Sequence, residues 1–150
     1  MNICNAVVRN PRESAFRHGF SGDLRRLRIG KTLLGKQAIH VLYVHGDLLF
    51  AGGSSVDGTA GKVFSLSTKE VIATLPTGSD IHCITANNDF VFIGTKSGIT
   101  DVYLRERLVR VASIKTGGGR ESSKITSLAS DSEGEMLYTG SSSGKIQKKG

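Results

Sequence analysis

Short apolar runs recur along the chain, and turns of Gly, Ser, Asn and Asp separate them. Three segments open with an isoleucine, at Ile39, Ile81 and Ile125, and each has a second aliphatic residue three places later. A polar turn follows each opening, and then an apolar run that closes on a glycine. These runs are Leu48–Gly52, Phe90–Gly94 and Met136–Gly140. Runs of this length and composition are typical of β-strands.

The three openings lie 42 and 44 residues apart, which is the spacing of a structural repeat. A further strand begins in each unit after a second turn, from Gly61, Gly98 and Gly144. A fourth strand follows in two of the units, at residues 70–76 and 108–114, and the third unit stops before it. Four short strands per period, joined by tight turns, predict one antiparallel blade per repeat.

A single blade leaves both of its faces exposed, so blades of this kind are stable only when they stack on neighbours. We therefore predict an all-β fold, a partial β-propeller of about three four-stranded blades with the last one incomplete. The expected organisation is a basic N-terminal arm over 1–36, with one stray strand between Leu24 and Leu34, and a propeller fragment over 37–150. Its repeats are expected at 38–78, 79–122 and 123–150.

One segment carries a resemblance to a known repeat family, and this resemblance implies that the predicted fold is a partial WD-repeat β-propeller. The segment VFSLSTKEVIATL, from Val63 to Leu75, resembles the end of a WD repeat. Phe64 and Ser65 stand where that family has its Trp-Asp pair, and Tyr103 and Leu104 stand there in the second repeat. The resemblance implies structural roles for these four residues. No repeat has the Trp-Asp pair itself, because the chain contains no tryptophan.

Longer stretches carry a closer resemblance: DFVFIGTKSGITDVYLRERLVRVASI, ITSLASDSEGEMLYTGSSSGKIQ and SSVDGTAGKVFSLSTKEV. They are similar to the C-terminal WD-repeat region of plant U-box/WD-repeat ubiquitin ligases of the CERBERUS or LIN type. In that family the U-box recruits the ubiquitin-conjugating enzyme and the repeats are taken to bind partners or substrates. No stretch here resembles a U-box, so the resemblance implies a non-enzymatic protein–protein interaction scaffold with other proteins as its partners.

The chain departs from that family after Gln147, where Lys148, Lys149 and Gly150 replace an expected Val-Trp pair. This departure indicates a truncated or altered terminus. Three blades are fewer than propellers usually need to close a ring. We therefore expect the open blade edges to permit self-association.

Charge separates the arm from the rest of the chain. The 150 residues carry a formal net charge of +7, with a pI of about 9.7. Residues 1–36 hold eight basic and two acidic residues, so the arm alone carries +6. One interpretation of this arm is a solvated leader. The alternatives are a segment that targets the protein to an organelle and a segment that binds nucleic acid or an acidic surface. The repeats themselves are nearly neutral, and for them we expect no nucleic-acid partner.

Candidate chemistry is sparse, and we predict no catalytic residue, cofactor or metal. Gly30-Lys31-Thr32 lacks the earlier glycine of a phosphate-binding loop. His40 and His82 occupy equivalent places on different repeats without further ligands at metal spacing, so we interpret them as ordinary strand positions. Cys83 follows His82 directly and should therefore point to the opposite face of the strand.

The last expectation concerns the partner surface and the location of the protein. WD propellers tend to bind partners where the fourth strand of one blade passes to the first strand of the next. Asp80 and Lys124 fall at these positions, and Lys96 falls in a loop on the same side. We expect these three residues to contact a partner. The chain has only two cysteines, which predicts an intracellular protein, cytoplasmic or nuclear. No run reaches 18 apolar residues, so we expect no membrane span.

Overall fold

The computed structural model describes residues 37–115, 123–131 and 133–150, and within these ranges every regular element is a β-strand. The strands form three antiparallel sheets in chain order, and each sheet is a meander in which consecutive strands pair. This arrangement confirms the predicted all-β fold of short strands. The basic arm and the stray strand expected between Leu24 and Leu34 lie outside the described residues.

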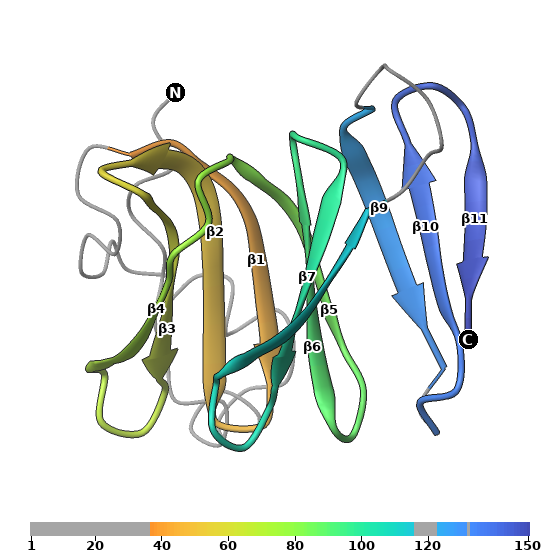
Figure 1. The fold of residues 1–150 in the computed structure, drawn as a ribbon. Coiled ribbons are helices and arrows are strands. Elements are labelled where there is room, and N and C mark those ends of the chain that lie inside the picture. Colours follow the sequence, from red (N-terminus) through yellow and green to blue (C-terminus); the bar gives the residue numbers. More distant parts are fainter. Residues whose placement is uncertain (1–36, 116–122, 132) are drawn as a thin grey trace, which may run out of the picture.

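The first sheet contains β1 (Ile39–His45), β2 (Leu48–Val56), β3 (Thr59–Ser65) and β4 (Val71–Leu75). The second sheet contains β5 (Ile81–Ala86), β6 (Phe90–Thr95), β7 (Ile99–Leu104) and β8 (Arg110–Lys115). The third sheet contains β9 (Ile125–Ser130), β10 (Leu137–Ser141) and β11 (Ile146–Lys149). The sheets stand side by side, with the first strands β1, β5 and β9 entering from the upper end in Figure 1.

Turn residues with left-handed backbone angles join the strands at that upper end. Asp57 and Gly58, between β2 and β3, have φ angles of 53° and 77°, which is the pattern of a type I′ hairpin turn. Gly98 and Gly144 occupy equivalent places in the next two sheets and both have φ of 81°. Glycine reaches these angles without steric cost, which explains its recurrence at this point of each repeat.

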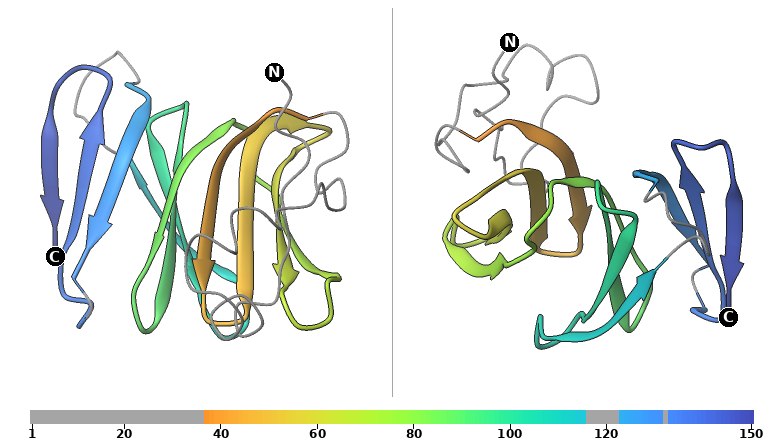
Figure 2. Two further views of the ribbon diagram at one scale, coloured as in Figure 1. Left: turned by 180° about the vertical axis from the view of Figure 1, so that it is seen from behind. Right: turned by 45° about the horizontal axis from the view of Figure 1, so that its top comes forward.

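Apolar side chains fill the space between neighbouring sheets, which fan out in Figure 2. The main cluster joins the first and second sheets and contains Phe50, Ile81 and Ile93, all fully buried or nearly so. A second cluster joins the second and third sheets around Phe92 and Leu137. Because each sheet has two apolar faces, burial depends on a neighbouring sheet rather than on a separate layer of helices.

Within each second strand, the glycine at the end of the apolar run leaves space that a side chain of the next sheet can enter. We call this space the glycine notch. A Cβ atom on Gly52 would lie 2.5 Å from Cγ2 of Ile81, and one on Gly94 would lie 2.6 Å from Cγ2 of Ile125. The isoleucine that opens a sheet therefore packs directly on the glycine of the preceding sheet. Any larger residue at Gly52 or Gly94 would push the neighbouring sheet away.

Within the described ranges, no helix has the length and apolar character needed to cross a membrane.

Candidate functional site

The upper end of the sheets carries the residues that the sequence singled out as a partner surface. One backbone hydrogen bond recurs there in each sheet, from a residue at or near the end of the second strand to the residue before the first strand. Its three occurrences are Ser54 N to Ala38 O at 3.0 Å, Lys96 N to Asp80 O at 2.9 Å and Ser142 N to Lys124 O at 2.9 Å. The bond places the side chains of Asp80, Lys96 and Lys124 at the same end of the molecule.

His40 and His82 meet at this end, which the sequence reasoning did not anticipate. Their rings stack across two neighbouring sheets, with centroids 4.8 Å apart and planes 30° apart. His40 is exposed and His82 is half-buried. The sequence did contain a signal for this contact, namely that the two histidines occupy equivalent positions in the first strands of neighbouring repeats. Equivalent positions of stacked sheets can lie side by side, although they belong to different sheets. Both residues are strand positions, as interpreted from sequence, in β1 and β5, and the stack between them is an additional feature.

Electrostatics connects this pair to the predicted partner residues. The pKa of His82 is lowered, first by burial and then by the positive charge of Lys124, with smaller contributions from His40 and Lys96. Asp80 acts in the opposite direction and raises it. The Nε2 atom of His82 is buried and has no hydrogen-bond partner among the described residues. The three predicted residues thus all act electrostatically on one imidazole at this end of the molecule.

Asp80 also holds two sheets together. Its Oδ1 accepts a hydrogen bond from the backbone N–H of Ser55 at 2.9 Å, across the boundary between the first and second sheets. The Ser55 hydroxyl donates to the carbonyl of Thr77 at 3.2 Å and reinforces the same contact. One carboxylate oxygen of Asp80 is therefore engaged within the chain. Of the two lysines, Lys96 is exposed and Lys124 is half-buried.

The described residues contain no group of three or more His, Cys, Asp or Glu side chains arranged to hold a metal ion. Cys83 is a free, buried thiol, and burial raises its pKa to about 12. A thiol with such a pKa stays protonated and is a poor nucleophile. Gly30-Lys31-Thr32 lies outside the described residues. What remains at the upper end is a set of charged and hydrogen-bonding side chains suited to contacts with another molecule.

The residues at the Trp-Asp positions lie in the interior of the first two sheets. Phe64 is 2% exposed and packs with Leu49 and Leu66 on the face of the first sheet that is turned away from the second. Ser65 is buried and donates a hydrogen bond of 2.9 Å to Oδ2 of Asp47. This bond links the end of β3 to the turn between β1 and β2.

In the second sheet Tyr103 is 2% exposed and packs between the first and second sheets. Burial is the main cause that raises its pKa, the charge of Asp101 adds to it, and Arg110 opposes it. The hydroxyl has no hydrogen-bond partner among the described residues. Leu104 is half-buried and has no polar group with which to repeat the link that Ser65 makes.

A second junction lies at the opposite, lower end of the sheets. The Arg105 guanidinium contacts Nε2 of His45 and lies 3.5 Å from the backbone oxygen of Asn87. The ring of His45 also stacks on Tyr43, with a centroid distance of 6.5 Å. Arg105 lies in the turn between β7 and β8, and its side chain joins the second sheet to the first, which explains its partial burial.

Comparisons with known proteins agree with this architecture. No protein-family model matches the chain. It is 59% identical over 117 residues to a Medicago truncatula protein named "Putative E3 ubiquitin-protein ligase LIN", and the match covers 78% of this chain. It is 60% and 58% identical over the same length to LIN-1 and LIN-2 of Lotus japonicus, which bear the corresponding names. The chain spans only 8% of the length of each relative.

Solved structures show the fold. The WD40 repeats of RRP9 match 75% of this chain with a TM-score of 0.65 and 15% identity, over 35% of their own length. The computationally designed Ika8 protein matches 79% of this chain with a TM-score of 0.65 and 18% identity, over 35% of its length. The expected resemblance is confirmed: the chain has the fold of WD40 repeats and is similar in sequence to a short stretch of plant LIN-type E3 ubiquitin-protein ligases.

Proposed function

We propose that this chain is a non-catalytic protein-interaction scaffold that supplies the partner- or substrate-recognition part of a plant ubiquitin ligase, without its U-box. Its sequence similarity to LIN-type ligases and its WD40 fold support this proposal. The reactive machinery of a ligase would then lie elsewhere in the larger protein. The free thiol of Cys83 is compatible with the cytoplasm or nucleus, where thiols stay reduced.

One observation carries the choice of surface. The upper end brings Asp80, Lys96 and Lys124 together around the stacked pair His40–His82, although these residues come from three repeats. A surface assembled from several repeats exists only when the sheets are stacked. We propose that the partner contacts Lys96 and Lys124, while Asp80 mainly holds the joint with Ser55.

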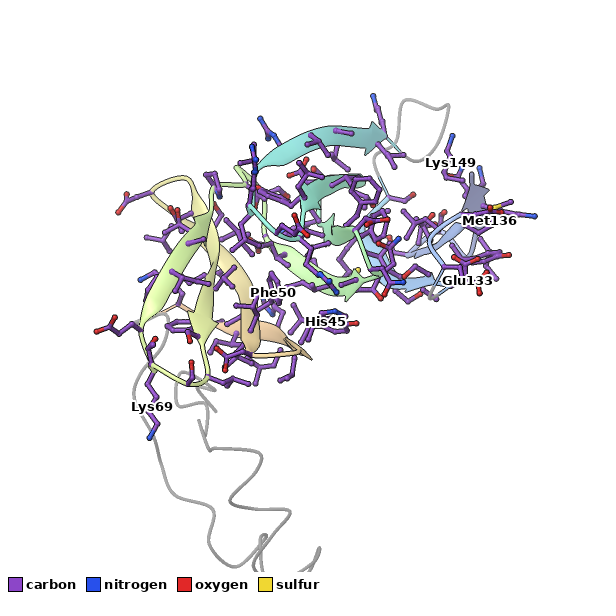
Figure 3. The ribbon with its side chains drawn as sticks, turned by 90° about the horizontal axis from the view of Figure 1, so that it is seen from below. His45, Phe50, Lys69, Glu133, Met136 and Lys149 are labelled. Carbon is purple, nitrogen blue, oxygen red and sulfur yellow. The ribbon has the colours of Figure 1, made fainter. Side chains whose placement is uncertain are left out.

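Charge reversal tests this assignment. The variant carries Lys96→Glu and Lys124→Glu, and the matched control carries Lys69→Glu and Arg107→Glu at the lower end. Lys69 projects from the turn between β3 and β4, as seen from below in Figure 3. Affinity capture from plant extract, with quantitative mass spectrometry, compares the proteins bound by each chain. We expect a partner that binds the unaltered chain and the control, and that is lost with the upper-end variant.

A partner found in this way should also be ubiquitylated by the full-length ligase, and the Lys96→Glu, Lys124→Glu pair should abolish that modification. Equal binding by both variants would exclude the upper end as the contact surface. Binding without any effect on ubiquitylation would separate the interaction from the proposed role in a ligase.

A further inference from the structure

The two ends of the sheets differ in charge. Among the described residues, the charged side chains of the upper-end turns are Lys96, Lys124, Lys145, Asp57 and Asp80. Each lower-end turn instead contains at least one acidic residue. One of the two upper-end carboxylates, that of Asp80, already accepts a hydrogen bond from the backbone of Ser55. The upper end is therefore the end that attracts an anionic partner.

The stacked histidines at this end are both extra residues of a β-bulge. Ile39 and Val41 pair with consecutive residues of β2, so His40 has no opposite residue, and His82 is placed in the same way in the second sheet. In the third sheet the extra residue is Thr126. A bulge takes a side chain out of the regular alternation of a strand and can aim it at a ligand. The stack thus consists of side chains that the regular strand pairing does not use.

The charges around His82 come from all three sheets. His40 lies in β1, Asp80 and Lys96 flank the second sheet at its upper end, and Lys124 directly precedes β9. These are the groups that act on the His82 ring, and of the charged side chains among them only Asp80 favours a proton there. An anion bound beside Lys96 and Lys124 would offset their two ammonium groups. It would also compensate a positive charge on the imidazole.

We propose that the partner presents an acidic segment, and that one aspartate or glutamate carboxylate of this segment binds against Lys96, Lys124 and the exposed ring of His40 while the His82 ring takes up a proton. The proton comes from solvent, and the carboxylate balances the charge that it adds. This inference rests on the proposed function, because it takes the upper end as the partner surface.

A carboxylate suits these cations better than a phosphate does. Phosphate groups are commonly recognised by clusters of arginine, whose planar guanidinium donates two parallel hydrogen bonds. The arginines of the described ranges are Arg105, Arg107 and Arg110, and they belong to the lower-end turn between β7 and β8 and to the start of β8. The cations at the stack are lysines, which act as point charges and need no bidentate partner.

Three labelled peptides test the class of ligand by fluorescence anisotropy with the full chain. The first alternates Asp with Ser, the second has Asn in place of every Asp, and the third is the Asn peptide with enough phosphoserines to match the charge of the first. We expect the Asn peptide to bind at least about tenfold more weakly than the Asp peptide. Tighter binding of the phosphorylated peptide, or equal binding of the Asp and Asn peptides, would overturn the proposal.

Paired variants test the position of the site. Lys96→Gln with Lys124→Gln should weaken binding of the Asp peptide by at least about tenfold. The matched control, Lys115→Gln with Lys145→Gln, removes the same charge from the upper end at two lysines that do not act on His82. It should weaken binding by less than about threefold. Equal effects of the two pairs would show that general attraction, and not this site, holds the peptide.

The proton gives a readout that charge attraction alone would not. Affinity for the Asp peptide should rise by at least about threefold between about pH 7.5 and 6, where aspartate stays ionised, because the carboxylate binds the protonated ring more tightly. Calorimetry in buffers of different ionisation enthalpy measures the proton uptake directly in the unaltered chain. His82→Gln should remove the rise, and His45→Gln at the lower end should keep it. A constant affinity without proton uptake, or an unchanged rise in His82→Gln, would overturn the proposal.

These results are distinct from those of the capture experiment. A captured partner that is lost with Lys96→Glu and Lys124→Glu, from a chain that does not bind the Asp peptide, would overturn the acidic segment and leave the upper end as the partner surface. An Asp peptide that needs Lys96 and Lys124 would support the acidic site even if no partner in the extract depended on them, and the proposed function would then fail alone.

Discussion

The imidazole of His40 stacks on that of His82, so two titratable rings join neighbouring sheets at their upper ends. Lys96, Lys124 and Asp80 are the other charged groups that act on His82. Protonation would place positive charge beside an exposed histidine and two lysines. It would also leave the buried Nε2 with a proton that no described residue accepts. Burial and these charges therefore favour the neutral form of the His82 ring by lowering its pKa.

This contact predicts a pH-dependent stability. The pKa of His82 is lower in the folded chain than its ordinary value of 6.5, so the unfolded chain binds the proton more tightly. The contribution of neutral His82 is present above pH 6.5 and is lost as the pH falls below it. Urea unfolding between pH 7.5 and 5.5 should show this loss, and His82→Gln should reduce it. The control His45→Gln, at the lower end, should retain the slope that His82 causes.

The glycine notches predict a contrast between equivalent substitutions. Gly94→Ala should lower the free energy of unfolding by about 1–3 kcal/mol, because its Cβ would meet Cys83 Sγ in its own sheet and Ile125 Cγ2 at 2.6 Å in the next. Gly140→Ala, in the third sheet, should cost less than about 1 kcal/mol, since its nearest neighbour is the Ser127 hydroxyl of its own sheet, which can rotate away. Chemical denaturation of the two variants measures the difference. Equal losses would show that the neighbouring isoleucine does not set the requirement for glycine.

The buried cysteine predicts slow thiol chemistry. Burial raises the pKa of Cys83 to about 12, so almost no thiolate forms at neutral pH. In a Cys4→Ser chain, the thiol should react with a disulfide reagent only after unfolding in denaturant. Rapid reaction under native conditions would mean that the second and third sheets separate readily.

The unpaired hydroxyl of Tyr103 predicts a neutral or favourable substitution. Tyr103→Phe removes a buried polar group that lacks a partner among the described residues, and it keeps the ring. We expect the free energy of unfolding to stay the same or rise by up to about 1 kcal/mol. Tyr103→Ala should instead lower it by about 3–5 kcal/mol through loss of packing between the first two sheets. Thermal or urea unfolding distinguishes the two effects.

The link between Ser65 and Asp47 predicts a measurable change at the carboxylate. Hydrogen bonds from Ser67 and then Ser65 lower the pKa of Asp47 below its ordinary value of 3.8. Ser65→Ala removes one of these donors, so the pKa of Asp47 should rise toward 3.8. An NMR titration of the carboxylate follows this shift directly. A pKa that does not move would leave Ser67 as the sole cause.

The strands could be predicted from sequence because their signals are local. Alternating apolar residues, polar turns and closing glycines identified the three sheets, and the repeat at Ile39, Ile81 and Ile125 indicated their stacking. The Trp-Asp resemblance assigned structural roles to Phe64 and Tyr103, and both side chains are buried.

The contacts between sheets could not be predicted, because they join residues 25 to 60 positions apart. The stack of His40 on His82 depends on how closely the first strands approach, and local pattern does not contain that distance. The contact between Arg105 and His45 depends on the same approach at the lower end. The bond from Ser55 to Asp80 likewise turned a predicted partner residue into one that also joins two sheets.

The recurring hydrogen bond at the upper end has a consequence for how such a surface can change. Ser54 to Ala38, Lys96 to Asp80 and Ser142 to Lys124 are all joined through backbone atoms, and the side chains at these six positions take no part in the bond. The frame that positions the surface is therefore independent of the chemistry displayed on it. A substitution at Lys96 can therefore change the charge displayed at this end while the strands keep their places. In an evolving lineage, this part of the molecule can change its displayed side chains at little structural cost.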